Sequence, residues 1–383
     1  MAETQTNCDI AVIGAGIAGA SVAAELAPHA RVLLLEMEPQ PGYHTTGRSA
    51  AVFAPSYGPA PVRALTRASR AFFQAPPPGF AAAPLFSPRR IMMIARRDQF
   101  PALEALIAEV GKATPASRIG ATELRAVNPL LRDGYASAAM LDENGQDIDV
   151  AALHQGYLRR LRAAGGTIMT RAEVTGLARS GDAWCAATRA GEVRAGIVVN
   201  AAGAWADRLG AMAGAGQIGL VPKRRTALTV AAPEGFDVSP LPITIDIDEQ
   251  FYLKPDAGRL LLSPADETPS PPCDAQPDEM DVAVCIDRIE TAFNLSVRRI
   301  ESKWAGLRSF VPDKSPVAGF STQAPGFFWL AGQGGYGIQT APALSRFAAA
   351  AILGRPVPPD IMDAGFDPDD LSPARLPVAA QSC

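Results

Sequence analysis

The sequence predicts an α/β fold in which a domain built on a parallel sheet is interleaved with an α+β domain built on an antiparallel sheet. The chain opens with a strand, a helix and a second strand over residues 10–36, which is the pattern of a parallel sheet. Two later apolar runs, 197–200 and 327–331, also end in small residues, and four short strand-like runs lie between them at 226–262. At 383 residues the chain exceeds the usual size of a single core.

The opening unit has the clearest pattern. The apolar strand 10–13 runs into a glycine turn, the small residues of 17–26 form a helix, and the apolar run 32–35 forms the next strand. Further on, Gly47-Arg48-Ser49-Ala50-Ala51 is expected to open a second helix directed at the site. A helix over 63–73 ends before a Pro-Pro-Pro-Gly break.

The middle of the chain is predicted to form the antiparallel sheet. Its strand candidates are 226–230, 243–247, 251–254 and 259–262, and Asp256-Ala257-Gly258 supplies a hairpin turn. The segment 263–279 is rich in Pro, Asp, Ser and Thr and is predicted to be a solvent-exposed connector before a helix over 280–293. This order assigns residues 1–85, 146–218 and 311–383 to the first domain, and residues 86–145 and 219–310 to the second.

Composition excludes several classes of function. A net charge of −4 and a pI near 5.6 give no general attraction to nucleic acid. No apolar run approaches the ~20 residues of a transmembrane segment, and the polar start Met1–Asn7 is unlike a signal peptide. We therefore expect a cytoplasmic protein, and the sequence leaves peripheral contact with the inner membrane open.

Cysteine and histidine usage narrows the chemistry further. The cysteines form no CxxC pair and are expected to be reduced thiols; they are Cys8, Cys185, Cys273, Cys285 and Cys383. With His29, His44 and His154 as its only histidines, the chain offers little for a histidine-rich metal centre or a Ser-His-Asp hydrolase. His44 is expected to shape a loop, and His154 to lie on a helix capped by Asp149.

The glycine turn carries the first functional signal. Gly14, Gly16 and Gly19 give the spacing G-x-G-x-x-G between a strand and a helix, where a tight turn brings backbone N–H groups close to a pyrophosphate. Glu36 lies 36 − 16 = 20 positions after Gly16, at the end of the next strand. A carboxylate there accepts hydrogen bonds from ribose hydroxyls and repels a 2′-phosphate, which favours FAD or NAD over NADP. The first domain is therefore predicted to be Rossmann-like.

The C-terminal part of the chain favours FAD over NAD. No second G-x-G-x-x-G follows a strand, as a separate nicotinamide cofactor would require. Instead the turn Gly332–Gly337 leads into a helix over 338–353, whose N-terminal dipole could stabilise negative charge on a reduced isoalloxazine ring.

Six longer runs carry a family resemblance. They are Gly42–Ala51, Leu153–Tyr157, Asn200–Trp205, Phe251–Pro255, Trp304–Phe310 and Gln333–Thr340. Over nearly its whole length the chain resembles the FAD-dependent D-amino acid oxidase and dehydrogenase superfamily, and within it the bacterial D-arginine dehydrogenase type. The resemblance implies a Rossmann-like FAD-binding domain with an interleaved substrate domain. The flavin is expected to be held non-covalently, because the C-terminal glycine turn contains no cysteine.

The resemblance also implies a set of cofactor-binding residues along the chain. They are Gly14, Gly16, Ala18, Gly19, Glu36, Met37, His44, Thr45, Thr46, Gly47, Arg48, Ser49, Ala50, Ala51, Val52, Val174, Gly203, Gly334, Gly335, Tyr336, Gly337, Ile338 and Gln339.

The resemblance assigns catalytic roles as well. Arg308 and Arg225 are expected to clamp a substrate carboxylate, because a guanidinium binds carboxylate bidentately. Tyr252 and Tyr57 would add hydroxyls, while Gln339 and the Gly335 carbonyl would orient the substrate amine. Beside Lys223 and Arg224, residue type alone leaves open which basic side chain of this strand points inward.

The family reaction is the oxidative deamination of D-amino acids. Hydride passes from Cα to flavin N5, and the imine product hydrolyses to a 2-oxo acid and ammonia. The electron acceptor would be a quinone, an electron-transfer partner or O2. Alternatives are an oxidase of D-amino acids or of secondary amines such as sarcosine, and a flavoprotein without catalytic activity.

Three positions modify the expected substrate. Arginine-acting relatives have an acidic residue where this chain has Ile91, and a His and a Thr where it has Val52 and Ala54. The side-chain pocket is therefore predicted to be apolar and to favour neutral apolar or aromatic D-amino acids. The loop Ala54–Pro59, which carries Tyr57, has the composition of a lid with Gly58 as its hinge, and an ordinary ordered loop is the alternative.

Overall fold

The computed structural model describes residues 6–111 and 114–376, and Cys383 lies outside them. One sheet of the described chain has eight strands. They are β1 (Thr6–Ile13), β2 (Val32–Leu35), β9 (Thr167–Met169), β10 (Val174–Ser180), β11 (Ala183–Thr188), β12 (Gly191–Asn200), β19 (Val317–Phe320) and β20 (Phe327–Ala331). The predicted β-α-β start is confirmed, because β1 pairs with β2 in parallel.

The parallel part of this sheet defines one functional edge. β1 also pairs in parallel with β12, which pairs in parallel with β20. The register aligns Ile13 with both Leu35 and Asn200. Since carboxyl ends of parallel strands meet at one edge, the segments that follow these strands come together there, as in other open α/β sheets.

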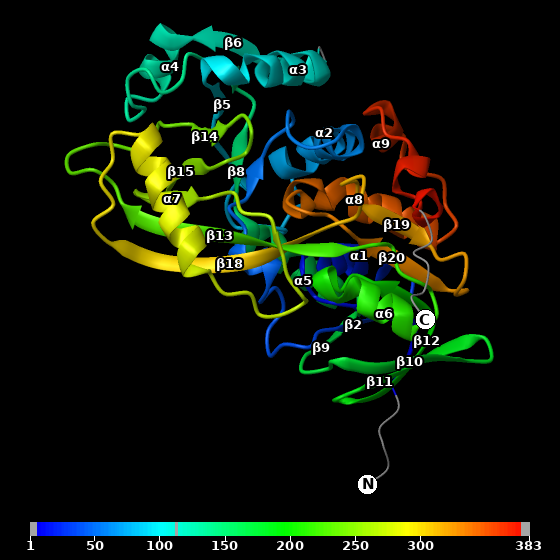
Figure 1. Ribbon diagram of the computed structural model, residues 1–383. Coiled ribbons are helices and arrows are strands. Elements are labelled where there is room, and N and C mark those ends of the chain that lie inside the picture. The colour runs from blue at the N-terminus through cyan, green and yellow to red at the C-terminus, as the bar shows by residue number, and fades with distance from the viewer. Residues whose placement is uncertain (1–5, 112–113, 377–383) are drawn as a thin grey trace.

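Helices cover both faces of this sheet (Figure 1). The α-helices of the described chain, including those beside the second sheet, are α1 (Ile17–Leu26), α2 (Ala60–Gln74), α3 (Phe100–Val110), α4 (Ala121–Val127), α5 (Val150–Ala163), α6 (Ala206–Met212), α7 (Glu279–Ala292), α8 (Gly337–Ile352) and α9 (Pro359–Asp363). α1 packs against α5 and α8, and α8 packs against α2, over one apolar core. α6 covers the other face, where Trp184 and Trp329 are buried.

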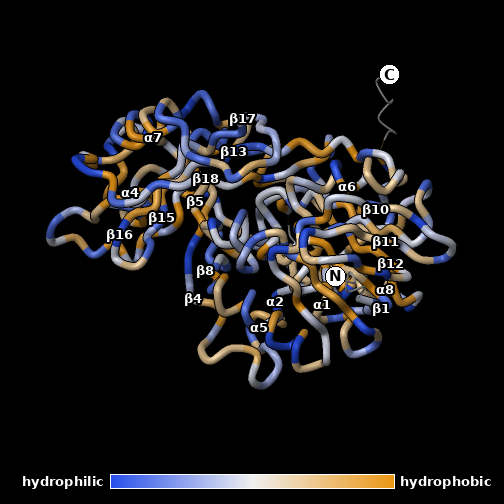
Figure 2. The backbone as a smooth tube through the Cα atoms, turned by 90° about the horizontal axis from the view of Figure 1, so that it is seen from below, coloured by the Kyte–Doolittle hydropathy of each residue, from blue (hydrophilic) through white to orange (hydrophobic). Residues whose placement is uncertain are grey.

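The second large sheet has nine strands among the described residues. They are β5 (Ile91–Ala95), β6 (Ser117–Gly120), β7 (Ala138–Asp142), β13 (Val221–Ala231), β14 (Ile243–Asp246), β15 (Tyr252–Asp256), β16 (Arg259–Ser263), β17 (Thr268–Pro269) and β18 (Ile300–Phe310). A small third sheet joins β3 (Val52–Phe53), β8 (Gln146–Ile148) and β4 (Phe86–Pro88). Figure 2 shows the two large sheets at opposite ends of the molecule.

The second sheet differs from the prediction in one pairing. Its strands pair antiparallel except β5 and β14, which pair in parallel. The predicted hairpin turn is confirmed: Asp256 pairs with Arg259 across Ala257 and Gly258, whose φ angles are 48° and 77°. Positive φ at both central residues matches the twist of a two-residue hairpin.

The prediction of a helix opening at Gly47–Ala51 is wrong. A 3₁₀ turn covers Thr45–Arg48 and the backbone is extended at Ser49. Hydrogen bonds from Thr45 and Arg48 to the carbonyls of β18 hold this segment across the second sheet, so it cannot coil into a helix.

The prediction of a largely solvent-exposed connector at 263–279 is confirmed, and the segment leads into α7 at Glu279. β17 within it pairs with β13, and Ala265 and Ala275 are buried. The Asp266 carboxylate accepts a hydrogen bond from the Thr226 backbone N–H at 2.6 Å, which anchors this part of the connector to β13.

Two further features concern the whole described chain. None of its helices is long and apolar enough to cross a membrane. Its four cysteines, Cys8, Cys185, Cys273 and Cys285, are free.

Candidate functional site

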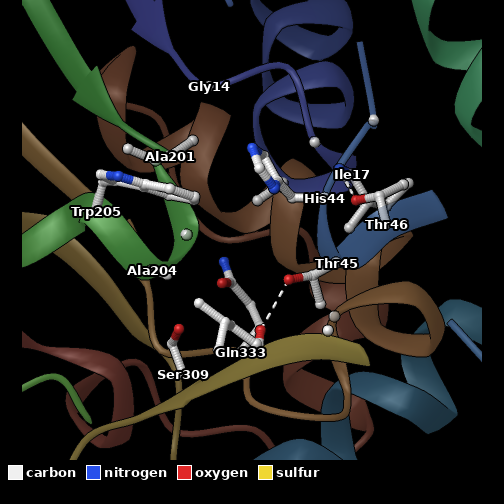
Figure 3. Close-up of a pocket in the computed structure, with 18 of the residues that line it drawn as sticks. Gly14, Ile17, His44, Thr45, Thr46, Ala201, Ala204, Trp205, Ser309 and Gln333 are labelled. Carbon is white, nitrogen blue, oxygen red and sulfur yellow. Dashed lines mark hydrogen bonds between the residues drawn. The ribbon is translucent and has the colours of Figure 1, made fainter. Parts of the chain in front are cut away.

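The glycine turn lies between β1 and α1, against the end of β12. Gly14 has φ 101°, and a methyl group added to it would lie 2.5 Å from the Ala201 carbonyl oxygen, so only glycine fits. A methyl group at Gly19 would overlap the Gly14 carbonyl, which explains the third glycine as a packing requirement. The first backbone N–H of α1, at Ile17, donates to Thr46 Oγ1 at 2.9 Å (Figure 3).

Glu36 follows β2 beside this turn and is 7% exposed. Its Oε2 accepts from the Ala15 N–H at 2.9 Å and its Oε1 from the Glu38 N–H at 3.0 Å. Burial raises the pKa of Glu36 above 4.5, although these two N–H donors oppose the shift. Each carboxylate oxygen keeps a second lone pair, so the group can still accept hydrogen bonds from ribose hydroxyls.

A large cavity runs from this turn along the carboxyl edge of the parallel strands to the second sheet. Most of the predicted cofactor-binding residues line it: Gly14, Gly16, Ala18, Glu36, Met37, His44, Thr45, Thr46, Arg48, Ser49, Ala50, Val174, Gly203, Gly334, Gly335, Gly337 and Ile338. Ala51, Val52 and Gln339 line a second cavity instead. Gly19, Gly47 and Tyr336 are not among the lining residues of either cavity.

Sequence reasoning missed several residues of the large cavity. Trp205, Leu307, Ser309 and Gln333 line it, and they lie within or beside the motifs already noted (Figure 3). The Ser309 hydroxyl is buried and has no hydrogen-bond partner among the described residues. Ser309 directly follows Arg308 in the run Trp304–Phe310, and its place in that run was the available signal.

The two predicted histidine positions differ in their surroundings. His44 lines the large cavity, with Nε2 at 2.9 Å from Glu38 Oε1. His154 lies on α5, whose N-terminus is capped by Asp149 as predicted. Burial lowers the pKa of His154, and its Nε2 lies 2.9 Å from the Ala15 carbonyl oxygen, as a neutral ring donating to the glycine turn would.

The 3₁₀ turn Thr45–Arg48 is fastened to the second sheet. Thr45 Oγ1 donates to the Leu307 carbonyl at 2.8 Å, and Arg48 Nη1 donates to the Ala305 carbonyl at 2.8 Å. In return, Trp304 Nε1 donates to the Arg48 carbonyl at 3.1 Å. The wall of the large cavity around Thr45–Arg48 therefore joins the segment after β2 to β18 of the second sheet.

A second cavity opens beside the N-terminus of α8. The structure brings all the predicted catalytic and side-chain-pocket residues together in its wall: Tyr57, Arg225, Tyr252, Arg308, Gly335, Gln339, Val52, Ala54 and Ile91. Arg225, Tyr252, Arg308 and Gly335 also line the large cavity, so the two cavities share a boundary. Glu249, Ile243, Ile245 and Ala265 complete this wall and were missed, because they lie on turns and strands with no motif.

Strand register decides which basic side chain of β13 points inward. Lys223 pairs with Arg308 of β18, so Arg225, two residues on, lies on the same face as Arg308. Arg224 points to the other face and binds Asp281 of α7 at 2.7 Å. Burial and the neighbouring Arg308 lower the pKa of Arg225, but a guanidinium stays charged at neutral pH.

Polar groups in this wall remain without partners. Arg225 Nε and Gln339 Nε2 are buried and make no hydrogen bond among the described residues. A methyl group at Gly335 would lie 2.9 Å from Arg308 Nη1, so glycine allows the guanidinium to reach the backbone of this turn. The cavity thus offers several unpaired donors to an anionic or polar ligand.

Tyr57 covers the far side of the second cavity. Its hydroxyl donates to Glu249 Oε2 at 3.1 Å, and its ring packs edge-on against Tyr336 at 5.2 Å between centroids. Burial and the Glu249 carboxylate raise the pKa of Tyr57 well above 10, so the hydroxyl stays protonated and donates. The same two causes raise the pKa of Tyr336 to about 12.

Fold and site together define an α/β flavoprotein. The glycine turn, the Glu36 carboxylate and the unpaired Ser309 hydroxyl fit a dinucleotide that extends toward α8. The family model described as DAO, FAD dependent oxidoreductase, matches residues 9–351, and the chain belongs to this family. Its cofactor is FAD.

Comparison with individual proteins gives more distant matches. The chain is 26% identical over 260 residues to mouse dimethylglycine dehydrogenase, covering 63% of this chain and 30% of that protein. The fold is shared with glycine oxidase from Geobacillus kaustophilus, at a TM-score of 0.82 and 22% identity over 96% of this chain and 98% of the other. L-Proline dehydrogenase from P. horikoshii gives a TM-score of 0.79 at 21% identity, over 95% and 100% of the two chains.

Proposed function

We infer that this protein oxidises D-amino acids by FAD-dependent deamination, as the D-arginine dehydrogenase type does. The observation that carries the proposal is the placement of Arg225, Arg308, Tyr252 and Gln339 in one cavity that borders the cofactor cavity. When bound, FAD accepts the hydride lost from the substrate α-carbon. The protein's own residues supply binding and orientation.

The arginine pair supports recognition of a carboxylate. Two inward guanidiniums on neighbouring strands leave the buried Arg225 Nε unpaired, and a substrate carboxylate would satisfy it. Each such charged hydrogen bond contributes about 1.5–3 kcal/mol. A ligand anchored there directs its α-carbon toward Gly335 and the start of α8.

The apolar wall supports neutral side chains. Val52, Ala54, Ile91, Ile243 and Ile245 line the second cavity. Burying an apolar side chain against them yields roughly 25 cal/mol per Å² removed from water. We therefore propose D-Leu, D-Met and D-Phe as better substrates than D-Arg.

An N-methylated amino acid is the second candidate. It rests on the sequence match to a dimethylglycine dehydrogenase. Such a substrate presents the same carboxylate to the arginine pair but fills less of the apolar wall. A flavoprotein without catalytic activity is the third reading, and retention of the whole arginine, tyrosine and glutamine set speaks against it.

Anaerobic mixing of the FAD-bound protein with amines separates these candidates. The panel comprises D- and L-forms of Leu, Met, Phe and Arg, with sarcosine and N,N-dimethylglycine. Rapid flavin bleaching by D-Leu, D-Met or D-Phe, with slower bleaching by D-Arg, is expected. Bleaching by the N-methyl amines alone favours the second candidate, and no bleaching by any amine refutes an enzymatic role. Readmitting O2 then distinguishes an oxidase, which reoxidises rapidly, from a dehydrogenase.

A further inference from the structure

The turn between β14 and β15 holds a non-glycine residue in the left-handed region. Glu249 has φ 53°. Its backbone N–H donates to the Asp246 carbonyl at 2.8 Å, and the Asp246 N–H donates to the Phe251 carbonyl at 3.0 Å. A side chain rarely adopts this backbone conformation unless its surroundings impose it. Something in this turn must therefore hold Glu249 in place.

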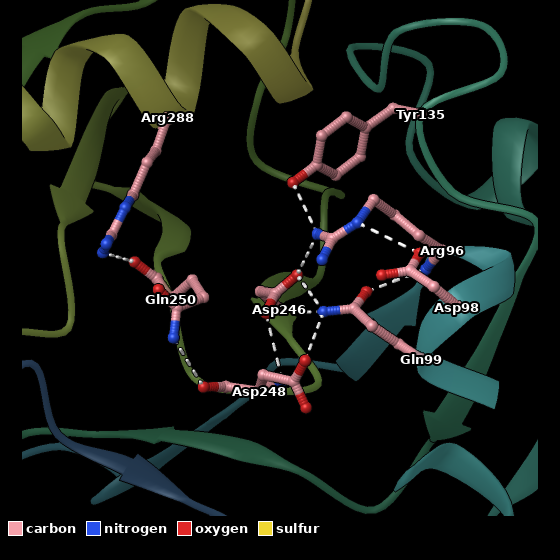
Figure 4. Close-up of polar contacts among 8 residues, drawn as sticks. All are labelled: Arg96, Asp98, Gln99, Tyr135, Asp246, Asp248, Gln250 and Arg288. Carbon is pink, nitrogen blue, oxygen red and sulfur yellow. Dashed lines mark hydrogen bonds and ion pairs between the residues drawn. The ribbon is translucent and has the colours of Figure 1, made fainter. Parts of the chain in front are cut away.

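The Asp246 carboxylate supplies this constraint from outside the cavity (Figure 4). Asp246 is fully buried, at 0% exposure. Its carboxylate accepts hydrogen bonds from the Asp248 backbone N–H at 3.0 Å, from Gln99 Nε2 at 3.2 Å and from Arg96 Nη1 at 3.3 Å. A buried carboxylate is retained only where donors compensate for its lost hydration, and here three separate groups do so.

Gln99 connects both acidic residues of the turn. Its Nε2 also donates to Asp248 Oδ2 at 2.8 Å, while its Oε1 accepts from the Arg96 backbone N–H at 2.9 Å. That backbone bond fixes the carboxamide with its NH2 group toward the turn. From the opposite side, Arg288 of α7 donates to the Gln250 carbonyl.

The other end of the turn reaches the second cavity. Glu249 lines the cavity wall and accepts the Tyr57 hydroxyl, whereas Asp246, Gln99 and Arg96 line neither cavity. The turn therefore connects the buried cluster of Asp246, Gln99 and Arg96 with the Glu249 carboxylate in the proposed substrate site.

We propose that Asp246 is a positioning residue for the second cavity. Through the turn Asp246–Phe251 it holds the Glu249 carboxylate against the Tyr57 hydroxyl, and so it sets how tightly the amino acid is enclosed. It touches neither substrate nor cofactor. Loss of Asp246 therefore weakens amino acid binding and leaves the rate of flavin reduction in the saturated complex unchanged. The kinetic form of this proposal rests on the proposed function.

Stopped-flow reduction by D-Leu separates binding from reduction. In Asp246→Asn the Kd for D-Leu should rise about tenfold, the loss expected from one hydrogen bond to a charged group, with the limiting reduction rate within about twofold of wild type. Gln99→Leu, which keeps Asp246 and removes its neighbouring donor, should raise the Kd in the same direction.

A matched control and a double mutant test whether Asp246 acts through Glu249. Thr244 lies on β14, as Asp246 does, and its Oγ1 accepts a buried hydrogen bond from Asn128 Nδ2 at 2.9 Å. Thr244→Val removes this bond without changing a residue of the turn, so it should leave the Kd for D-Leu unchanged. In a Glu249→Gln background, Asp246→Asn should have little further effect, because residues acting through one another are not additive. A full additional tenfold rise in that background, or an equal rise in Thr244→Val, overturns the proposal.

Hydrogen exchange gives a readout that needs no activity. In the FAD-bound protein, Asp246→Asn should speed amide exchange in the segment 54–58 that carries Tyr57, and Thr244→Val should not. If wild type is reduced by no amine, the proposed function fails while this comparison still decides the positioning role. Unchanged exchange at 54–58 in a folded Asp246→Asn protein contradicts it.

Discussion

The Ala54 backbone N–H donates to Gln339 Oε1 at 2.8 Å and thereby fixes the orientation of the Gln339 carboxamide. Gln339 Nε2 is buried at the second cavity and has no hydrogen-bond partner among the described residues. A free amine offers a lone pair to this donor, whereas an ammonium group does not. In the proposed reaction, Gln339 would therefore favour the substrate with a free amine, from whose α-carbon hydride can leave.

This orientation gives the first prediction. Gln339→Glu keeps an acceptor for Ala54 but turns an acceptor toward the amine, so it stabilises the ammonium form and raises the amine's pKa in the complex. The rate of flavin reduction at pH 7 should fall about tenfold for each unit of that shift and recover at higher pH. Gln339→Leu removes the donor without adding a negative charge, so it should weaken binding and shift the pH profile in the same direction by a smaller amount. Superimposable pH profiles for wild type and Gln339→Glu would remove Gln339 from amine recognition.

Arginine neighbours on β13 provide a matched pair for the second prediction. Arg225→Met should raise the Kd for a D-amino acid about 10- to 100-fold, because it removes charged hydrogen bonds worth about 1.5–3 kcal/mol. Arg308→Leu should act in the same way, with FAD still bound. Arg224→Met loses its outward ion pairs with Asp266, Asp278 and Asp281 and no group in the second cavity, so binding should stay within about twofold. Equal effects of Arg224→Met and Arg225→Met on D-Leu titrations would contradict an inward clamp.

The glycine turn predicts two different failures. Gly14→Ala should prevent stable folding, because the new methyl group would lie 2.5 Å from the Ala201 carbonyl at φ 101°. Gly16 has φ −70°, and a methyl group there meets only Thr46 Oγ1 at 3.2 Å. Gly16→Ala should therefore fold but bind FAD weakly, since the methyl group occupies the approach to the pyrophosphate. Circular dichroism and the bound flavin absorbance distinguish the two outcomes.

Glu36 is expected to make FAD binding pH-dependent. The pKa of Glu36 is raised by burial, and only the ionised carboxylate accepts both ribose hydroxyls. FAD affinity should be constant well above this raised pKa and should fall as the pH drops through it. Glu36→Gln should bind FAD more weakly and lose this pH dependence. Fluorescence titration of the apoprotein with FAD at several pH values measures both, and an unchanged pH dependence in Glu36→Gln would contradict the assignment.

Local patterns predicted the strand, turn and helix that bring the glycine turn and Glu36 to one cavity. The spacing of Gly14, Gly16 and Glu36 is set by one strand-turn-helix-strand unit, so sequence distance fixes their arrangement in space. The same holds for the hairpin at Ala257 and Gly258, where residue type dictates the turn.

Long-range contacts account for what the sequence could not predict. Glu249 lines the second cavity from a turn whose neighbouring Asp248 binds Gln99, about 150 positions earlier, and no local pattern encodes that contact. Gly47–Ala51 is not helical because Thr45 and Arg48 bind a strand that lies far along the chain. The choice of Arg225 over Arg224 depended on strand register, which composition does not encode.

The attachment of the turn Thr45–Arg48 to β18 couples the cofactor to the stability of both sheets. A ligand that binds only the folded chain stabilises it by about 2.7 kcal/mol at 100 times its Kd. Because residues of both sheets line the large cavity and Thr45–Arg48 is bound to β18, FAD bound there would stabilise both sheets at once. Flavin supply would then govern the lifetime of the whole polypeptide. Heat denaturation of the FAD-bound protein should be a single cooperative transition in which unfolding and flavin release coincide.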